Sequence, residues 1–89
     1  MRYLVKVRVN PESLAEFGRK LQAGALDRSL IRSETYCLRA DLAVGYSVWE
    51  AEERERFDAV FSAWKEFYAE AEIMEIVSPD EAMRMLFKK

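Results

Sequence analysis

The fold is decided by residues 57–77, which read FDAVFSAWKEFYAEAEIMEIV. At about 100° per residue, seven apolar side chains of this stretch project into an arc of roughly 120°. The polar residues fall outside that arc, so the spacing predicts an amphipathic helix that leads into a strand over residues 72–77. Its aromatic stripe needs a flat apolar surface to pack on, which a small sheet can supply. The stripe consists of Phe57, Val60, Phe61, Trp64, Phe67, Tyr68 and Ala71.

Two further helices are indicated by the residues at their ends. Asn10 followed by Pro11 is typical of a helix start, and Gly24 is typical of a helix end. Ser78 and Glu81 have the spacing of a capping box, which predicts a short tail helix after the last strand.

Three more strands complete the pattern, over residues 2–9, 30–38 and 43–50. The order of elements is therefore β-α-β-β-α-β followed by a tail helix. With short connections and right-handed crossovers, this order predicts a ferredoxin-like α+β fold. Such a fold has a four-stranded antiparallel sheet with two helices on one face. We expect residues 1–89 to form a single domain.

The composition excludes several classes of function. The 89 residues carry a formal net charge of −2, which does not suit binding to nucleic acid. The chain contains no His, so the commonest general base and zinc ligand are missing. Its one cysteine, Cys37, is expected to be buried in a strand and inert. No apolar run reaches the roughly 20 residues that cross a membrane. We therefore expect a cytoplasmic protein with no cofactor, no metal site and no nucleic-acid or membrane partner.

The alternation of the first strand predicts which face of the sheet the helices cover. Its valine face is expected to pack on the helices, which leaves Leu4, Lys6 and Arg8 on the open face. By alternation, the second and third strands add aromatic and charged residues to this open face. Such a face is too aromatic to leave in water and too charged to bury unpaired, so we expect a second copy to cover it around a partly polar cavity. The candidate ligand-binding residues on this face are Lys6, Arg8, Arg32, Glu34, Tyr36, Ser47 and Trp49.

The order of elements, the length and the run of FSAWKEF into EAEIMEIVSP resemble the dimeric α/β-barrel superfamily. Residues 57–79 are most similar to a small uncharacterised bacterial family within it. The resemblance implies a homodimer whose two sheets face each other as a barrel. The superfamily includes antibiotic-biosynthesis-type monooxygenases, muconolactone-isomerase-like proteins and haem-degrading enzymes. The haem-degrading members use a His, and others use a His–Asp pair, so their catalytic residues do not carry over to this chain.

We therefore expect a homodimer that binds a small aromatic or anionic ligand between its sheets. Lys6 and Arg8, together with Arg32, would hold a carboxylate or a similar anion. Trp49 and Tyr36 would stack on a flat ring. An alternative is a cofactor-independent monooxygenase- or isomerase-like enzyme acting on a small aromatic compound. In that case Tyr36 or Tyr46 could act as a proton donor.

A purely structural interaction module is the remaining alternative. In this interpretation, Lys6 and Arg8 pair with Glu34 or Glu75 across the sheet or the dimer. Trp49 then fills volume in the interface. The sequence alone does not decide among these three functions.

Overall fold

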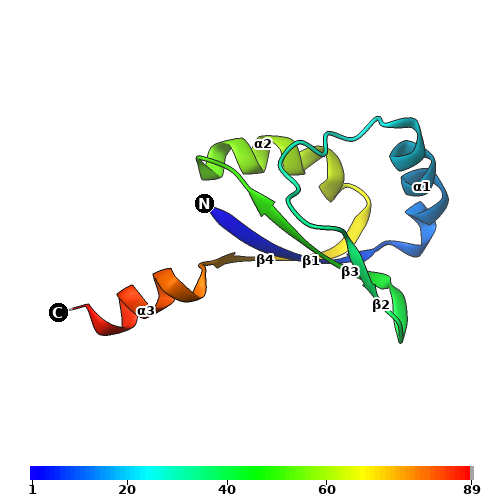
Figure 1. Cartoon of the computed structure of the whole chain (residues 1–89). Coiled ribbons are helices and arrows are strands. Elements are labelled where there is room, and N and C mark those ends of the chain that lie inside the picture. The colour runs from blue at the N-terminus through cyan, green and yellow to red at the C-terminus, as the bar shows by residue number, and fades with distance from the viewer. Residues whose placement is uncertain (89) are drawn as a thin grey trace.

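The computed structural model describes residues 1–88 and contains one antiparallel sheet with the strand order β2-β3-β1-β4. Helices α1 and α2 lie on the same side of the sheet, while α3 projects from its end (Figure 1). The predicted ferredoxin-like α+β fold is confirmed. No helix in the described part of the chain is long and apolar enough to span a membrane. The elements are β1 (Arg2–Val9), a 3-10 helix η1 (Pro11–Ser13), α1 (Leu14–Ala23), β2 (Tyr36–Leu38), β3 (Asp41–Glu50), α2 (Arg54–Lys65), β4 (Tyr68–Ile76) and α3 (Pro79–Phe87).

The predicted helix ends are confirmed by their hydrogen bonds. Asn10 Oδ1 accepts a hydrogen bond from the Glu12 backbone N–H at 3.2 Å. Gly24 closes α1 with a φ of 69°, a left-handed conformation that glycine adopts without steric cost. Ser78 Oγ accepts from the Glu81 N–H at 3.1 Å and caps α3.

The amphipathic helix is shorter than its aromatic stripe predicts. Helix α2 ends at Lys65, and β4 begins at Tyr68, so Tyr68 and Ala71 lie on the strand. Tyr68 is paired with Val9 of β1 across the sheet. The backbone of these residues therefore forms ladder hydrogen bonds with β1 and not helical ones. Because β1 is distant in sequence, helical periodicity does not indicate this pairing.

The predicted second strand, residues 30–38, is mostly irregular, and only its last three residues form β2. In the irregular part, Ser33 Oγ accepts a hydrogen bond from the Val48 backbone N–H at 2.9 Å. A side chain here takes the place of a backbone carbonyl in the ladder. Arg32 and Glu34, which were predicted to lie within a strand, belong to the connecting segment instead.

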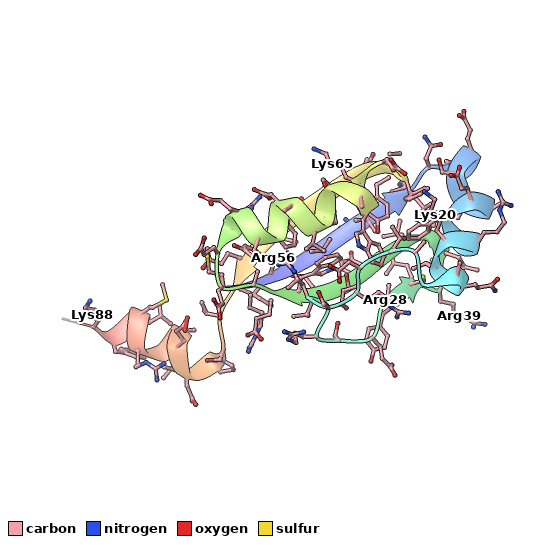
Figure 2. All side chains as sticks on the ribbon, turned by 90° about the horizontal axis from the view of Figure 1, so that it is seen from above. Lys20, Arg28, Arg39, Arg56, Lys65 and Lys88 are labelled. Atoms are coloured by element: carbon pink, nitrogen blue, oxygen red, sulfur yellow. The ribbon has the colours of Figure 1, made fainter. Side chains whose placement is uncertain are left out.

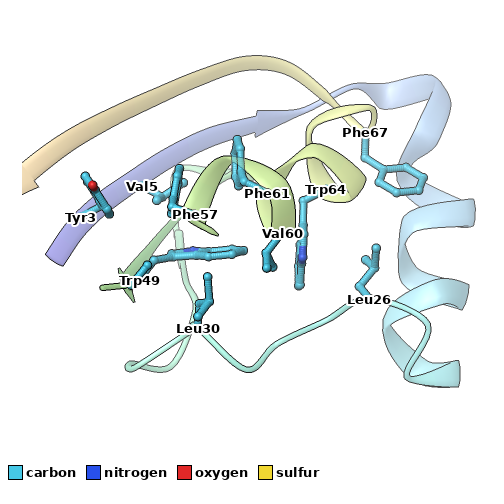
Figure 3. Close-up of a cluster of buried hydrophobic side chains, with 11 residues drawn as sticks. Tyr3, Val5, Leu26, Leu30, Trp49, Phe57, Val60, Phe61, Trp64 and Phe67 are labelled. Atoms are coloured by element: carbon cyan, nitrogen blue, oxygen red, sulfur yellow. The ribbon is translucent and has the colours of Figure 1, made fainter. Parts of the chain in front are cut away.

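The hydrophobic core lies between the sheet and α2 (Figure 3). Tyr3 and Val5 on β1 are 1% and 2% exposed, and Phe57 on α2 is completely buried. Trp49 on β3 packs edge-on against three aromatic rings of α2, each with its centroid at 5.5 Å. The valine face of β1 therefore packs on the helices, as the sequence predicts.

The prediction that Ser47 and Trp49 lie on the open face is wrong. In the antiparallel ladder they lie opposite Val5 and Tyr3, and directly opposed residues share a face of the sheet. Alternation groups the residues of β3 correctly, but it does not say which group faces the helices. Packing decides this, because a ring as large as that of Trp49 fills the space under α2. The open face of β3 instead carries Val44, Tyr46 and Val48.

Candidate ligand-binding cavity

Arg8 and Lys6, the cations predicted to bind a ligand on the open face, lie close to other side chains of the same chain. Arg8 Nη1 lies 2.6 Å from Asp41 Oδ2, and Arg8 Nε lies 3.9 Å from Glu70 Oε2. The hydrogen bond from Arg8 holds the pKa of the Asp41 carboxyl below its usual range. Lys6 Nζ lies 6.0 Å from the centroid of the Tyr46 ring. The ion pairs of Arg8 use carboxylates other than the Glu34 and Glu75 side chains expected from the sequence.

The seven predicted site residues do not converge on one site. Arg32 Nε lies 3.3 Å from Glu50 Oε1, and Arg32 Nη1 donates to the Ser29 carbonyl at 2.6 Å. Glu34 lies exposed in the segment before β2. The set therefore divides into three groups: Lys6, Arg8 and Tyr36 on the open face, Ser47 and Trp49 on the helix side, and Arg32 and Glu34 in the connecting segment.

A cavity of about 230 Å³ lies on the helix side of the sheet, beside the core. Its floor is β3, where the small residues Ala43, Gly45 and Ser47 occupy alternate positions. Trp49 follows at the next position of this series, and Trp64 contributes from α2. The cavity exists because three successive side chains on this face are too small to fill the space that Trp49 fills farther along the strand.

The other walls come from α1 and from residues 24–35, the segment that follows it. Phe17 and Leu21 of α1 line the cavity. The Phe17 ring lies 5.2 Å from the Phe67 ring and 5.7 Å from the Tyr68 ring, centroid to centroid. No residue of α1 is buried, so this helix covers the sheet without filling the space beneath it.

The lining is mainly apolar, but it also includes four residues with uncharged polar groups: Tyr68, Ser47, Thr35 and Cys37. Burial raises the pKa of the Tyr68 phenol, which therefore stays protonated and can donate a hydrogen bond. Ser47 Oγ accepts a hydrogen bond from the Trp49 indole N–H at 2.8 Å and keeps its own proton to donate. In the described part of the chain, no group of three or more acidic, Cys or His residues is arranged to hold a metal ion.

Cys37, which was predicted to be buried and inert, is exposed. It lies opposite Gly45 in the ladder between β2 and β3, and its side chain lines the cavity. The prediction placed Cys37 in the interior of a long strand. The strand is in fact three residues long and forms an edge of the sheet, which leaves the thiol accessible.

The alternation of residues along β3 contains a sequence signal for the cavity. Ala43, Gly45 and Ser47 form a run of small side chains on one face of a strand whose other face carries Val44, Tyr46 and Val48. A Cβ atom at Gly45 would meet Thr35 Cγ2 at 3.7 Å, an ordinary van der Waals distance. Glycine is therefore not required by crowding at this position, and its missing side chain leaves open volume.

Comparison with solved structures places the fold among known proteins. 5-Chloro-2-hydroxyhydroquinone dehydrochlorinase from Burkholderia phenoliruptrix, in complex with 2,5-dihydroxybenzoquinone, is similar with a TM-score of 0.58 and 15% identity. The match covers 91% of this chain and 98% of that one. An antibiotic biosynthesis monooxygenase is similar with a TM-score of 0.50 and 12% identity, over 86% of this chain and 98% of that one. At these identities the likeness concerns the fold.

Both neighbours support the ferredoxin-like fold of the chain. No curated protein matches the chain in sequence. The family described as a domain of unknown function, DUF3303, matches it over residues 1–89. The chain therefore belongs to the DUF3303 family.

Proposed function

We propose that this protein binds a small, single-ring aromatic molecule in the cavity beneath α1. The observation that carries this proposal is a cavity of about 230 Å³ with a mainly apolar lining and a few polar atoms. An apolar cavity of about 150 Å³ is large enough for benzene, so this volume suits one ring with small substituents. Trp49 and Trp64 offer aromatic surface against which such a ring can pack.

The polar atoms of the lining favour a ring that bears oxygen. The protonated Tyr68 phenol can donate to a carbonyl or ring oxygen, while Ser47 and Thr35 offer hydroxyl groups near the floor. The dihydroxybenzoquinone held by the structurally similar dehydrochlorinase is a compound of this kind. This proposal places the ligand between the sheet and the helices of one chain, and not between two sheets.

We further propose that the protein is a homodimer in which the open face of one sheet meets that of its partner. Tyr36 on this face is 62% exposed and Met74 is 38% exposed. Leu4 and Val48 lie on the same face and are only half-buried. Exposed apolar side chains gathered on one face of a sheet are typical of an interface. Because the face also carries charges of both signs, a second copy can cover it without general repulsion.

Helix α3 supports the same assembly. It projects from the end of the sheet, and none of its residues is buried (Figure 1). Leu86 and Phe87 are 74% and 70% exposed and share a stripe with Ala82 and Met83 at helical spacing. A nine-residue helix has little stability by itself in water, so this stripe needs a surface to pack on. The second copy of the chain supplies that surface in the proposed dimer.

A cofactor-independent enzyme acting on the same ring is the second candidate. The position of Tyr68 favours it, because a protonated phenol in an apolar site can stabilise or protonate an oxyanion. Tyr68→Phe would then abolish turnover of a hydroxylated ring while the ring still binds. A variant that retains full turnover would rule out this role for Tyr68.

Calorimetric titration with phenol and hydroquinone tests the proposed binding function. Wild-type protein should bind at least one of the two rings at a single saturable site per chain. Gly45→Val should remove this binding, because the new side chain extends from the cavity floor. Ala69→Val is the matched control, since Ala69 is an exposed residue of β4 outside the cavity lining. Equal binding by both variants would contradict the proposal.

A further inference from the structure

Among residues 1–88, Arg28 is the only charged residue that lines the cavity. Building on the proposed function, we propose that Arg28 makes the cavity selective for a single aromatic ring that carries a carboxylate. Arg28 comes from the segment between α1 and β2 and is set apart from Arg56 and Lys65 on α2 (Figure 2). The cations that the sequence predicts to bind an anion are Lys6, Arg8 and Arg32, and the first two lie on the opposite face of the sheet.

The Arg28 guanidinium is free to bind a ligand. Within residues 1–88, no ion pair involves Arg28, whereas four other arginines pair with carboxylates. A guanidinium presents five N–H donors in a planar fork, which matches the two oxygens of a carboxylate. The four paired arginines are Arg2, Arg8, Arg32 and Arg54.

The backbone around Arg28 is held in place. Leu26 and Leu30, two residues before and after it, are 6% and 8% exposed and point into the core cluster (Figure 3). The Trp64 indole N–H donates to the Asp27 carbonyl at 3.1 Å, which ties the segment to α2. Because the backbone of the segment is already fixed, little backbone conformational entropy is lost when Arg28 binds a ligand.

The position of Arg28 among the lining residues favours a ligand with one charged end. Arg28 is an exposed residue, while most of the lining consists of aliphatic and aromatic side chains. A carboxylate paired with Arg28 can therefore keep contact with water, which limits the cost of removing its hydration. The ring can then occupy the apolar space beside Trp49 and Trp64.

Titration calorimetry with benzoate and benzamide tests this selectivity, because the two rings differ little except in charge. Wild-type protein should bind benzoate about tenfold more tightly than benzamide. Arg28→Gln should remove this preference and leave the affinity for benzamide within about twofold of the wild-type value. Arg39→Gln is the matched control, since Arg39 is exposed in the β2–β3 turn and does not line the cavity.

The possible failures are distinguishable. Equal affinities for benzoate and benzamide in the wild type would overturn the role of Arg28 and leave the proposed binding function standing. The same would follow if Arg39→Gln reduced benzoate binding as much as Arg28→Gln does. If the wild type bound neither these two rings nor phenol and hydroquinone, the proposed function itself would fail, and this inference with it.

Discussion

Cys37 is a single thiol that lies exposed at the cavity, opposite Gly45. We predict that a disulfide reagent labels one thiol per native chain without prior unfolding, because β2 is an edge strand that leaves Cys37 accessible. A ring bound in the cavity should slow the labelling, which absorbance during mixing would measure. Labelling that requires a denaturant would contradict the exposed position of this residue.

Also at the residue scale, the face of the sheet on which Trp49 lies is not determined by the sequence pattern. Alternation correctly puts Ser47 and Trp49 on one face of β3, but hydrophobicity favours the other face of β3, with Val44 and Val48, as the one that packs on the helices. The structure has the opposite orientation, because the Trp49 ring fits between three aromatic rings of α2. Volume complementarity between distant segments determines this outcome, and no local pattern encodes it.

At the scale of helices and strands, sequence signals that involve only a few neighbouring residues predict the structure correctly. The caps at Asn10, Gly24 and Ser78 form as predicted, because each depends only on hydrogen bonds and dihedral angles within one turn. The end of α2 and the extent of β2 depend on pairing with distant strands. The sequence of residues 30–38 therefore predicts a strand, although most of these residues form irregular structure at the edge of the sheet.

Helix α3 provides a prediction at this scale. Leu86→Glu and Phe87→Glu, made together, should convert the proposed homodimer to a monomer, because they place two charges in the exposed apolar stripe. Light scattering coupled to size-exclusion chromatography measures the mass. Arg84→Glu is the matched control, since it introduces the same residue outside the stripe. A wild type with the mass of a single chain at every concentration would contradict the dimer.

At the scale of the whole molecule, ion pairs between elements link stability to pH. The hydrogen bond from Arg8 on β1 lowers the pKa of Asp41 on β3, and that from Arg2 lowers the pKa of Glu50. A carboxyl whose pKa is depressed in the folded state stabilises that state above its unfolded pKa and loses the contribution as the pH falls. The loss therefore occurs below about pH 4.

We predict that Arg8→Gln reduces this dependence on pH. The urea midpoint of the wild type should fall as the pH drops from about 5 to about 2, and that of the variant should fall less. Arg39→Gln, which removes an arginine that forms no ion pair within residues 1–88, should behave like the wild type. An identical decline in Arg8→Gln and the wild type would show that the Asp41 pair does not contribute.

The two tryptophans report directly on where the proposed ligand binds. Trp49 and Trp64 are the only tryptophans of the chain, and both line the cavity. Heteronuclear NMR during titration with benzoate should therefore show saturable shifts of both indole N–H signals. The side-chain signals of Tyr36 and Met74, which lie exposed on the open face, should stay in place. Shifts of these two side chains with unchanged indole signals would place the ligand on the open face and contradict the proposed cavity.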